Sequence, residues 1–162
     1  MANTLTLTDE FNVDSKLLYE QFLDLRKYGV YHPVMTNVKV ILDDTPKFIE
    51  YEIDEIVKVF GFITIHPNYK AKVYEIEKGK HLQYTSQVKP SVFLTIDLYF
   101  SENSGNTKVD EHISVTGNEI ITTIFLGMLK KAHLGLFQNL KESLRSRTGN
   151  DSVKLKLCHS YS

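Results

Sequence analysis

The chain has 162 residues, of which 42% are hydrophobic and 24% are charged, and this composition is ordinary for one soluble domain with one core. The formal net charge of −1 and the lack of a basic patch interleaved with aromatic residues argue against a nucleic-acid partner. A single cysteine, Cys158, excludes an intrachain disulfide. Because the first residues also lack the pattern of a signal peptide, we expect a cytoplasmic protein.

The first elements predicted are a strand and a short helix. Residues 3–13 alternate between apolar and polar side chains, which is typical of a half-buried strand. Asp14 is expected to cap a helix, since its side chain can accept bonds from the free amides of the first turn. We expect Tyr28-Gly29 to end this helix. The segment Tyr31-His32-Pro33 should then turn the chain, because the residue before a proline avoids helical angles.

The middle of the chain is predicted to form strands joined by turns. They are expected at 38–42, 48–60, 62–66 with 69–77, 81–89, 92–100 and 107–116. The two parts 62–66 and 69–77 are interpreted as one strand interrupted at Pro67, because proline cannot donate to a sheet ladder. Successive strands joined by short turns form a curved antiparallel sheet, and such a sheet must cover one face to be stable.

One long amphipathic helix is predicted at 118–147. Its apolar stripe consists of Ile121, Phe125, Met128, Ala132, Leu136, Leu140 and Leu144. Either Thr116 with Glu119 or Asn118 is expected to cap its start, and Gly149 to end it. The apolar run 120–129 is far shorter than the roughly 20 residues that span a bilayer, so we expect a core helix and no transmembrane segment.

Two glycines fall inside this helix. Gly127 and Gly135 each destabilise a helix by roughly 1 kcal/mol relative to alanine. Close packing against the sheet would explain them, and so would room for a ligand beside the helix. Both interpretations stay open. Beyond the helix, residues 150–162 have no apolar period and are predicted to form a disordered tail.

The order of elements resembles the START-like, helix-grip superfamily, also called SRPBCC, which includes polyketide cyclases and lipid-transfer domains. The resemblance covers 3–147 and rests on the strand TLTLTDEFNVD, the helix SKLLYEQFLDLRKY, the turn 31–33 and the helix IITTIFLGMLKKAHLGLFQNLKESL. It implies an α+β domain over 1–149. In it, a curved antiparallel sheet of about six to seven strands, with two short helices after the first strand, is covered by the long C-terminal helix over a cavity. No catalytic set is universal in the superfamily. Tyr28 or Tyr31 is expected to replace a tryptophan that many relatives carry near the proline.

Strand alternation places three carboxylates among inward-facing apolar residues: Asp9, Glu55 and Glu111. An apolar cavity disfavours the charged form of a carboxylate, so its pKa would rise toward the range useful for acid–base work or ligand anchoring. The alternative for each is a bulge or a wet strand end. His32 and His133 are candidates for proton relay, with a structural role as the alternative. The catalytic candidates are therefore Glu55, Glu111 and His32.

The predicted ligand-binding residues share the inward faces of strands and helix. They are Tyr51, Glu55, Tyr84, Ser86, Glu111, Phe125, Met128 and Ala132. The six histidines show no HxxxH or HxH spacing and the chain has no cofactor motif, so neither a metal nor a cofactor is expected.

Three functions stay open at this point. The first is binding or transport of a small hydrophobic ligand such as a lipid, an isoprenoid or an aromatic polyketide. The second is a cyclase or dehydratase that uses the cavity carboxylates or histidine. The third is a protein-interaction module built on an outward stripe of Phe93, Thr95, Asp97 and Tyr99. A monomer or a homodimer fits each of them.

Overall fold

The computed structural model describes the backbone of residues 2–158 and the side chains of residues 2–147. Along the chain the described elements are β1 (Ala2–Phe11), α1 (Ser15–Leu23), α2 (Leu25–Tyr31), β2 (Met35–Asp44), β3 (Phe48–Glu55), β4 (Val57–Val59), β5 (Ile63–Ile65), β6 (Asn68–Glu77), β7 (His81–Lys89), β8 (Val92–Asn103), β9 (Asn106–Thr116) and α3 (Glu119–Cys158).

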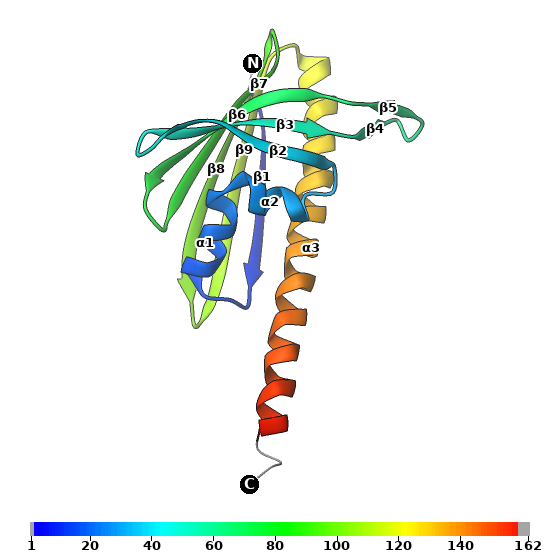
Figure 1. Ribbon diagram of the computed structural model, residues 1–162. Coiled ribbons are helices and arrows are strands. Elements are labelled where there is room, and N and C mark those ends of the chain that lie inside the picture. Colours follow the sequence, from blue (N-terminus) through cyan, green and yellow to red (C-terminus); the bar gives the residue numbers. More distant parts are fainter. Residues whose placement is uncertain (1, 159–162) are drawn as a thin grey trace.

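Seven strands form one curved antiparallel sheet in the order β1-β9-β8-β7-β6-β3-β2, and α3 runs along its concave side (Figure 1). Helices α1 and α2 follow β1, and the side-chain amide of Asn139 on α3 donates to the carbonyl of Tyr31 at the end of α2. This is the predicted helix-grip arrangement, so the fold class is confirmed.

Alternating buried residues of β8 and β9 form part of the inner face of the sheet. Every second residue is buried from Val92 to Phe100 in β8 and from Thr107 to Val115 in β9. The buried residues are Val92, Leu94, Ile96, Leu98, Phe100, Thr107, Val109, Glu111, Ile113 and Val115. Glu111 thus occupies a core position in an otherwise mostly apolar series. On α3, the middle of the predicted stripe is buried at Ala132, Leu136 and Leu140, whereas Ile121 near its start is exposed.

The residues predicted to cap α1 and α3 do so in the structure, but the predicted helix end at Tyr28-Gly29 differs from the end of α2. Asp14 Oδ1 accepts hydrogen bonds from the amides of Lys16 and Leu17, as predicted. The expected break at Tyr28-Gly29 is wrong, because α2 continues to Tyr31. Gly29 lies inside the helix where α2 crosses β2, and a Cβ there would lie 2.8 Å from Cγ2 of Val38. The glycine therefore permits a close approach.

Asn118 is the residue that caps α3. Its Oδ1 accepts from the amides of Ile120 and Ile121, at 3.1 and 3.4 Å. The helix runs to Cys158, so the end predicted at Gly149 is wrong. Because the side chains after Arg147 and the backbone after Cys158 lie outside the described residues, the division into a domain over 1–149 and a disordered tail over 150–162 stays a prediction.

Two predicted strands are divided differently in the structure. The strand expected at 48–60 ends at Glu55, and Val57–Val59 pairs instead with Ile63–Ile65 as a separate two-stranded sheet. The interrupted strand over 62–77 is therefore wrong as well, since its two parts belong to different sheets. This β4–β5 hairpin projects beside the first turns of α3 (Figure 1).

Helix α3 is the core helix of this domain. By length and composition alone, Glu119–Arg147 would suffice to cross a membrane, a property that core helices of soluble proteins share. The apolar run 120–129 is only part of this helix, so its short length does not settle the question. Packing of the whole helix distinguishes a core helix from a membrane helix. Leu136, Phe137 and Leu140 are each at most 2% exposed, because they pack into the core beneath the sheet.

The two helix glycines have different surroundings. A Cβ at Gly135 would lie 3.2 Å from Cγ of Pro33, so close packing accounts for this position, whereas a Cβ at Gly127 would meet nothing within 4 Å. We therefore expect Gly127→Ala to raise the free energy of unfolding by about 0.5–1 kcal/mol, through helix propensity alone. Urea denaturation followed by circular dichroism measures the change. A loss of stability would show that the site needs glycine.

Candidate functional site

A pocket of about 250 Å³, here called the outer pocket, lies between the β4–β5 hairpin and the first turns of α3. Its lining is almost entirely apolar and includes Val57, Ile65, Val92, Phe125 and Met128. The hairpin supplies one wall because its alternating valines and isoleucines turn toward the helix. Apolar surface of this kind binds apolar ligands because contact removes it from water.

A smaller pocket of about 40 Å³, here called the inner pocket, adjoins the outer one. Glu55, Tyr69, Leu94 and Leu129 line both pockets. The inner pocket adds the polar side chains of Tyr28, His32, Tyr84, Thr85, Ser86 and His133. The two pockets thus form one apolar space with a polar inner end.

Glu111 and His133 form a buried pair behind this inner end. Oε1 of Glu111, which is fully buried on β9, lies 2.7 Å from Nδ1 of His133 on α3. The other carboxylate oxygen, Oε2, has no hydrogen-bond partner among the described residues. The short Glu111–His133 hydrogen bond, in a buried setting, fixes the orientation of the His133 ring. Nε2 is then the ring nitrogen not engaged with Glu111.

His32, in the turn after α2, lies in the inner pocket. Its ring meets that of His133 edge-on, with centroids 5.5 Å apart, and its Nδ1 has no partner among the described residues. Burial, and secondarily the neighbouring His133, lower the pKa of His32 to about 3. The ring is therefore neutral at pH 7, and a neutral imidazole presents one donor and one acceptor.

Glu55 stands at the junction of the two pockets. The hydroxyl of Tyr69 donates to Oε1 of Glu55 at 2.6 Å. Burial raises the pKa of Glu55, while the Tyr69 hydrogen bond and the neighbouring His133 act in the opposite direction. Burial of Tyr69, together with the charge of Glu55, raises the pKa of this tyrosine well above its ordinary value. Tyr69 therefore stays protonated and acts as a hydrogen-bond donor.

The remaining predicted ligand-binding residues divide into three groups. Phe125 and Met128 line the outer pocket. Tyr84 and Ser86 line the inner pocket, but both hydroxyls are already bound: Tyr84 donates to the carbonyl of Phe22, and Ser86 to that of Lys70. The third group, Tyr51 and Ala132, is buried yet lines neither pocket. Tyr51 belongs to the core cluster, and Ala132 is 9% exposed.

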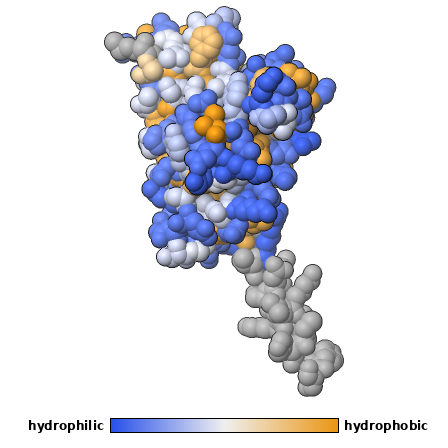
Figure 2. Space-filling model, turned by 90° about the vertical axis from the view of Figure 1, so that its left-hand side faces the viewer, coloured by the Kyte–Doolittle hydropathy of each residue, from blue (hydrophilic) through white to orange (hydrophobic). Residues whose placement is uncertain are grey.

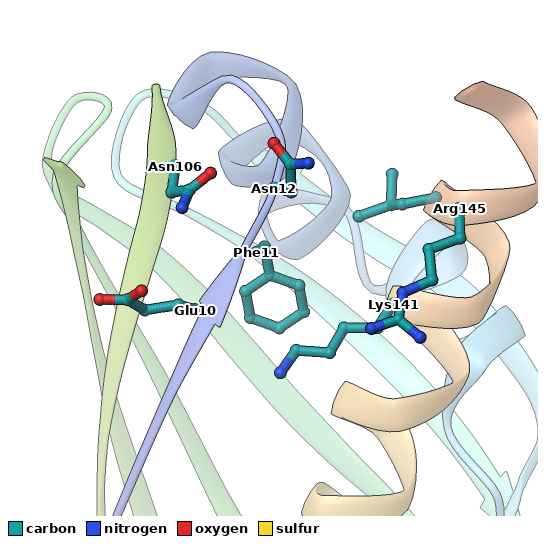
Figure 3. A pocket seen from close by; sticks show the side chains of 7 residues that line it. Glu10, Phe11, Asn12, Asn106, Lys141 and Arg145 are labelled. Carbon is teal, nitrogen blue, oxygen red and sulfur yellow. The ribbon is translucent and has the colours of Figure 1, made fainter. Parts of the chain in front are cut away.

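Asp9 shares the inward side of β1 with Leu7 and Phe11, as alternation predicted, but it lines neither pocket. It is ion-paired with Lys141 near the opposite end of the domain. A separate pocket of about 260 Å³ lies there, lined by Phe11, Lys141 and other mostly polar residues (Figure 3). Lys141 is thus committed to Asp9, and its ammonium also lies 5.4 Å from the ring centroid of Phe11.

The outward stripe on β8 is also present. Phe93 and Tyr99 are exposed, and Asp97 accepts a hydrogen bond from Gln83 and lies 2.8 Å from Nε2 of His81. A role in protein interaction stays a prediction. No group of three His, Cys, Asp or Glu side chains near enough to hold a metal ion occurs among the described residues.

Sequence reasoning did not select Tyr28, Tyr69 or Leu129 as site residues. Tyr69 shares an inward face with Ala71 and Val73 on β6, so alternation contained a usable signal for it. Leu129 lies one position beyond the apolar stripe of α3, and Tyr28 was assigned to a helix break. Neither carries a local signal for a pocket.

No protein-family model matches the chain, and no curated protein matches it. Solved structures do match in fold. The Zhui aromatase/cyclase from Streptomyces sp. R1128 is 10% identical, with a TM-score of 0.75 over 91% of this chain and 96% of that one. Ara h 8.0201 is 10% identical, with a TM-score of 0.70 over 90% and 99%. A START superfamily protein from Mycobacterium smegmatis is 10% identical, with a TM-score of 0.65 over 88% and 97%. The chain has the START-like, helix-grip fold.

Proposed function

We propose that this protein binds a small, mainly hydrophobic ligand that carries one polar group, such as a hydroxyl or a carbonyl. The observation that carries the proposal is the adjoining pair of pockets, one apolar and one polar at its inner end. The outer volume of about 250 Å³ lies just below the range of about 300–1,000 Å³ typical of small-molecule sites. A small aromatic or short-chain ligand therefore fits better than a large lipid.

The polar end of the ligand would be neutral. His32 is uncharged at pH 7, and its Nδ1 has no partner among the described residues; a buried polar atom without a partner is unfavourable by about 1–3 kcal/mol. A hydroxyl or carbonyl reaching the inner pocket would satisfy it. The carboxylates nearby, Glu55 and Glu111, would repel an anionic group. We also propose a cytoplasmic location, because a chain with a single cysteine has no intrachain disulfide.

Ligand binding is tested with probes of matched shape. Isothermal titration calorimetry with naphthol and with methylnaphthalene should show binding of both, because both fit an apolar pocket. The preference for naphthol over methylnaphthalene should fall about tenfold in His32→Phe, which removes the hydrogen-bonding ring. Native mass spectrometry of the purified protein would identify a co-purifying molecule.

Two helix substitutions control this experiment. Met128→Trp fills the outer pocket and should abolish binding of both probes. Leu134→Trp changes an exposed position of the same helix and should leave binding unchanged. If neither probe binds the wild-type protein and no apolar molecule co-purifies, the proposed function is wrong.

A second candidate function is acid–base catalysis of the cyclase or dehydratase type. One observation favours it: the Glu111 carboxylate is within hydrogen-bond distance of a second titratable group, His133, beside the pocket. Glu111 would orient the imidazole, and Nε2 of His133 would take a proton from a carbon or hydroxyl of the substrate. If Glu55→Gln and Glu111→Gln both leave turnover of a true substrate unchanged, this candidate fails.

A further inference from the structure

Exposed hydrophobic residues concentrate around the entrance of the outer pocket. They come from the β4–β5 hairpin with its flanking residue and from the first turns of α3, and together they are here called the mouth surface. Its members are Ile56, Phe60, Phe62, Ile63, Ile65, Ile120, Ile121 and Ile124. The opposite side of the molecule, the left-hand side of Figure 1, is mostly hydrophilic with only small hydrophobic areas (Figure 2). Apolar side chains gathered in one place mark an interaction surface.

The tip of the hairpin presents two aromatic rings to solvent. Phe60 is 70% exposed and Phe62 is 79% exposed, on either side of Gly61. Phe60 and Gly61 both adopt left-handed backbone angles, with φ of 52° and 80°. A bulky residue rarely takes this conformation, so a phenylalanine at such an exposed turn is not explained by folding. Across the entrance, Ile120 on α3 is 73% exposed.

The exposed charges nearest this surface are mainly positive: Lys58 lies on the hairpin and Lys89 lines the outer pocket, whereas the acidic Glu119 begins α3 beside Ile120. The hairpin segment 56–67 and the turn 88–92 contain Lys58 and Lys89 and no aspartate or glutamate, whereas Lys130 lies on the β1 side of α3. The whole chain nevertheless has a net charge of −1, so the remainder is acidic. Hydrophobic residues bordered by lysines suit a partner that is apolar inside and anionic at its surface.

We propose that the mouth surface docks on an anionic lipid bilayer, with the hairpin tip inserted among the acyl chains and the lysines near the headgroups. Apolar side chains that enter the interface and cations attracted to anionic lipids are the two contributions to such binding. A second copy of this chain is the less favourable occupant. In a two-fold symmetric contact, the lysines of one mouth surface would face those of the other.

Docking at this place gives the pocket direct access to lipid. Ile65, Ile121 and Ile124 belong to the mouth surface and also line the outer pocket. An apolar molecule would pass from the bilayer into the pocket without crossing water. The docking inference itself stands on the surface and holds whether or not the ligand proposal is correct.

The absence of tryptophan from the chain provides a clean reporter. We would place the single tryptophan at the tip with Phe62→Trp and mix the protein with vesicles of phosphatidylcholine and phosphatidylglycerol. The expected result is a blue shift of the emission and its quenching by brominated acyl chains. Vesicles of phosphatidylcholine alone should bind less, because they offer no anionic partner to the lysines.

Co-sedimentation with the same vesicles gives the decisive comparison. The double variant Phe60→Ser/Phe62→Ser should lower vesicle partitioning at least about tenfold, since it removes two rings from the apolar contact. The matched control is Phe93→Ser, an exposed ring on the outer face of β8, which should leave partitioning unchanged. Lys58→Glu/Lys89→Glu should weaken binding to anionic vesicles and provides a second test if the tip variant fails to fold.

Two results would overturn the inference. One is partitioning that is absent in the wild type or is unaffected by the tip and lysine variants. The other is a dimer in light scattering that dissociates in Phe60→Ser/Phe62→Ser, which would assign the mouth surface to a second copy. Calorimetry with naphthol in the same variants separates loss of docking from loss of ligand binding.

Discussion

Replacing Glu111 with leucine should lower the free energy of unfolding by about 3–5 kcal/mol, measured by urea denaturation at pH 7. The side chain is fully buried on β9 and lies 2.7 Å from His133, which is 3% exposed. Removal of one member leaves the other polar group in the interior without a partner. His133→Leu should therefore destabilise the protein to a similar extent.

The double variant Glu111→Leu/His133→Leu separates two quantities: the net contribution of the pair to the free energy of unfolding, and the cost of leaving one member buried without its partner. Because well-packed hydrophobic residues often replace a buried ion pair at little cost, the double variant should be more stable than either single variant. Asp9→Leu is the control. It breaks the Asp9–Lys141 pair, which also joins the sheet to α3 but is about one-third exposed, and should cost less than about 1 kcal/mol. Additive single effects would contradict a direct Glu111–His133 interaction.

The stability of the wild-type protein should fall at acidic pH through His32. Its pKa is about 3 in the folded protein against an ordinary value of 6.5, because burial disfavours the charged ring. Between these two pH values the unfolded chain binds a proton that the folded chain does not. The free energy of unfolding therefore decreases as pH falls from 6.5 toward 3, by about 1.4 kcal/mol per pH unit. Above pH 6.5 the ring is neutral in both states, so His32 no longer makes stability depend on pH.

His32→Phe isolates this contribution from that of the carboxylates. The two proteins should have similar stability near pH 8, where His32 is neutral in both states. Near pH 4 the variant should be more stable than the wild type by about 3 kcal/mol, since it has no proton to take up on unfolding. Urea denaturation over a series of pH values measures the difference. A difference that stays constant with pH would exclude a buried, neutral His32.

The fold was predictable because its signals are local and repeated along the chain. Alternation defined β1, β8 and β9, and the apolar stripe identified α3 and the side it buries. The errors arose where tertiary contact decided the outcome. Gly29 remains helical because α2 lies against Val38, and the end of β3 at Glu55 follows from a hairpin that pairs with itself.

The candidate site was predictable only in part, for a related reason. Alternation indicated that Glu55 and Glu111 face inward, and both do. It could not bring His32 next to His133, because that contact depends on where α3 crosses the turn after α2. Tyr51 and Ala132 share the predicted inward faces but line neither pocket. A face is a property of the sequence, whereas a pocket depends on how neighbouring elements are spaced.

The separation of β4 and β5 from the main sheet also has a kinetic consequence. Their backbone groups pair only with each other among the described strands, and an isolated two-stranded hairpin is marginally stable in water. This wall of the outer pocket can therefore open by local unfolding while the seven-stranded sheet stays intact. A bound molecule larger than the entrance would then leave at the opening rate of a short hairpin, without global unfolding.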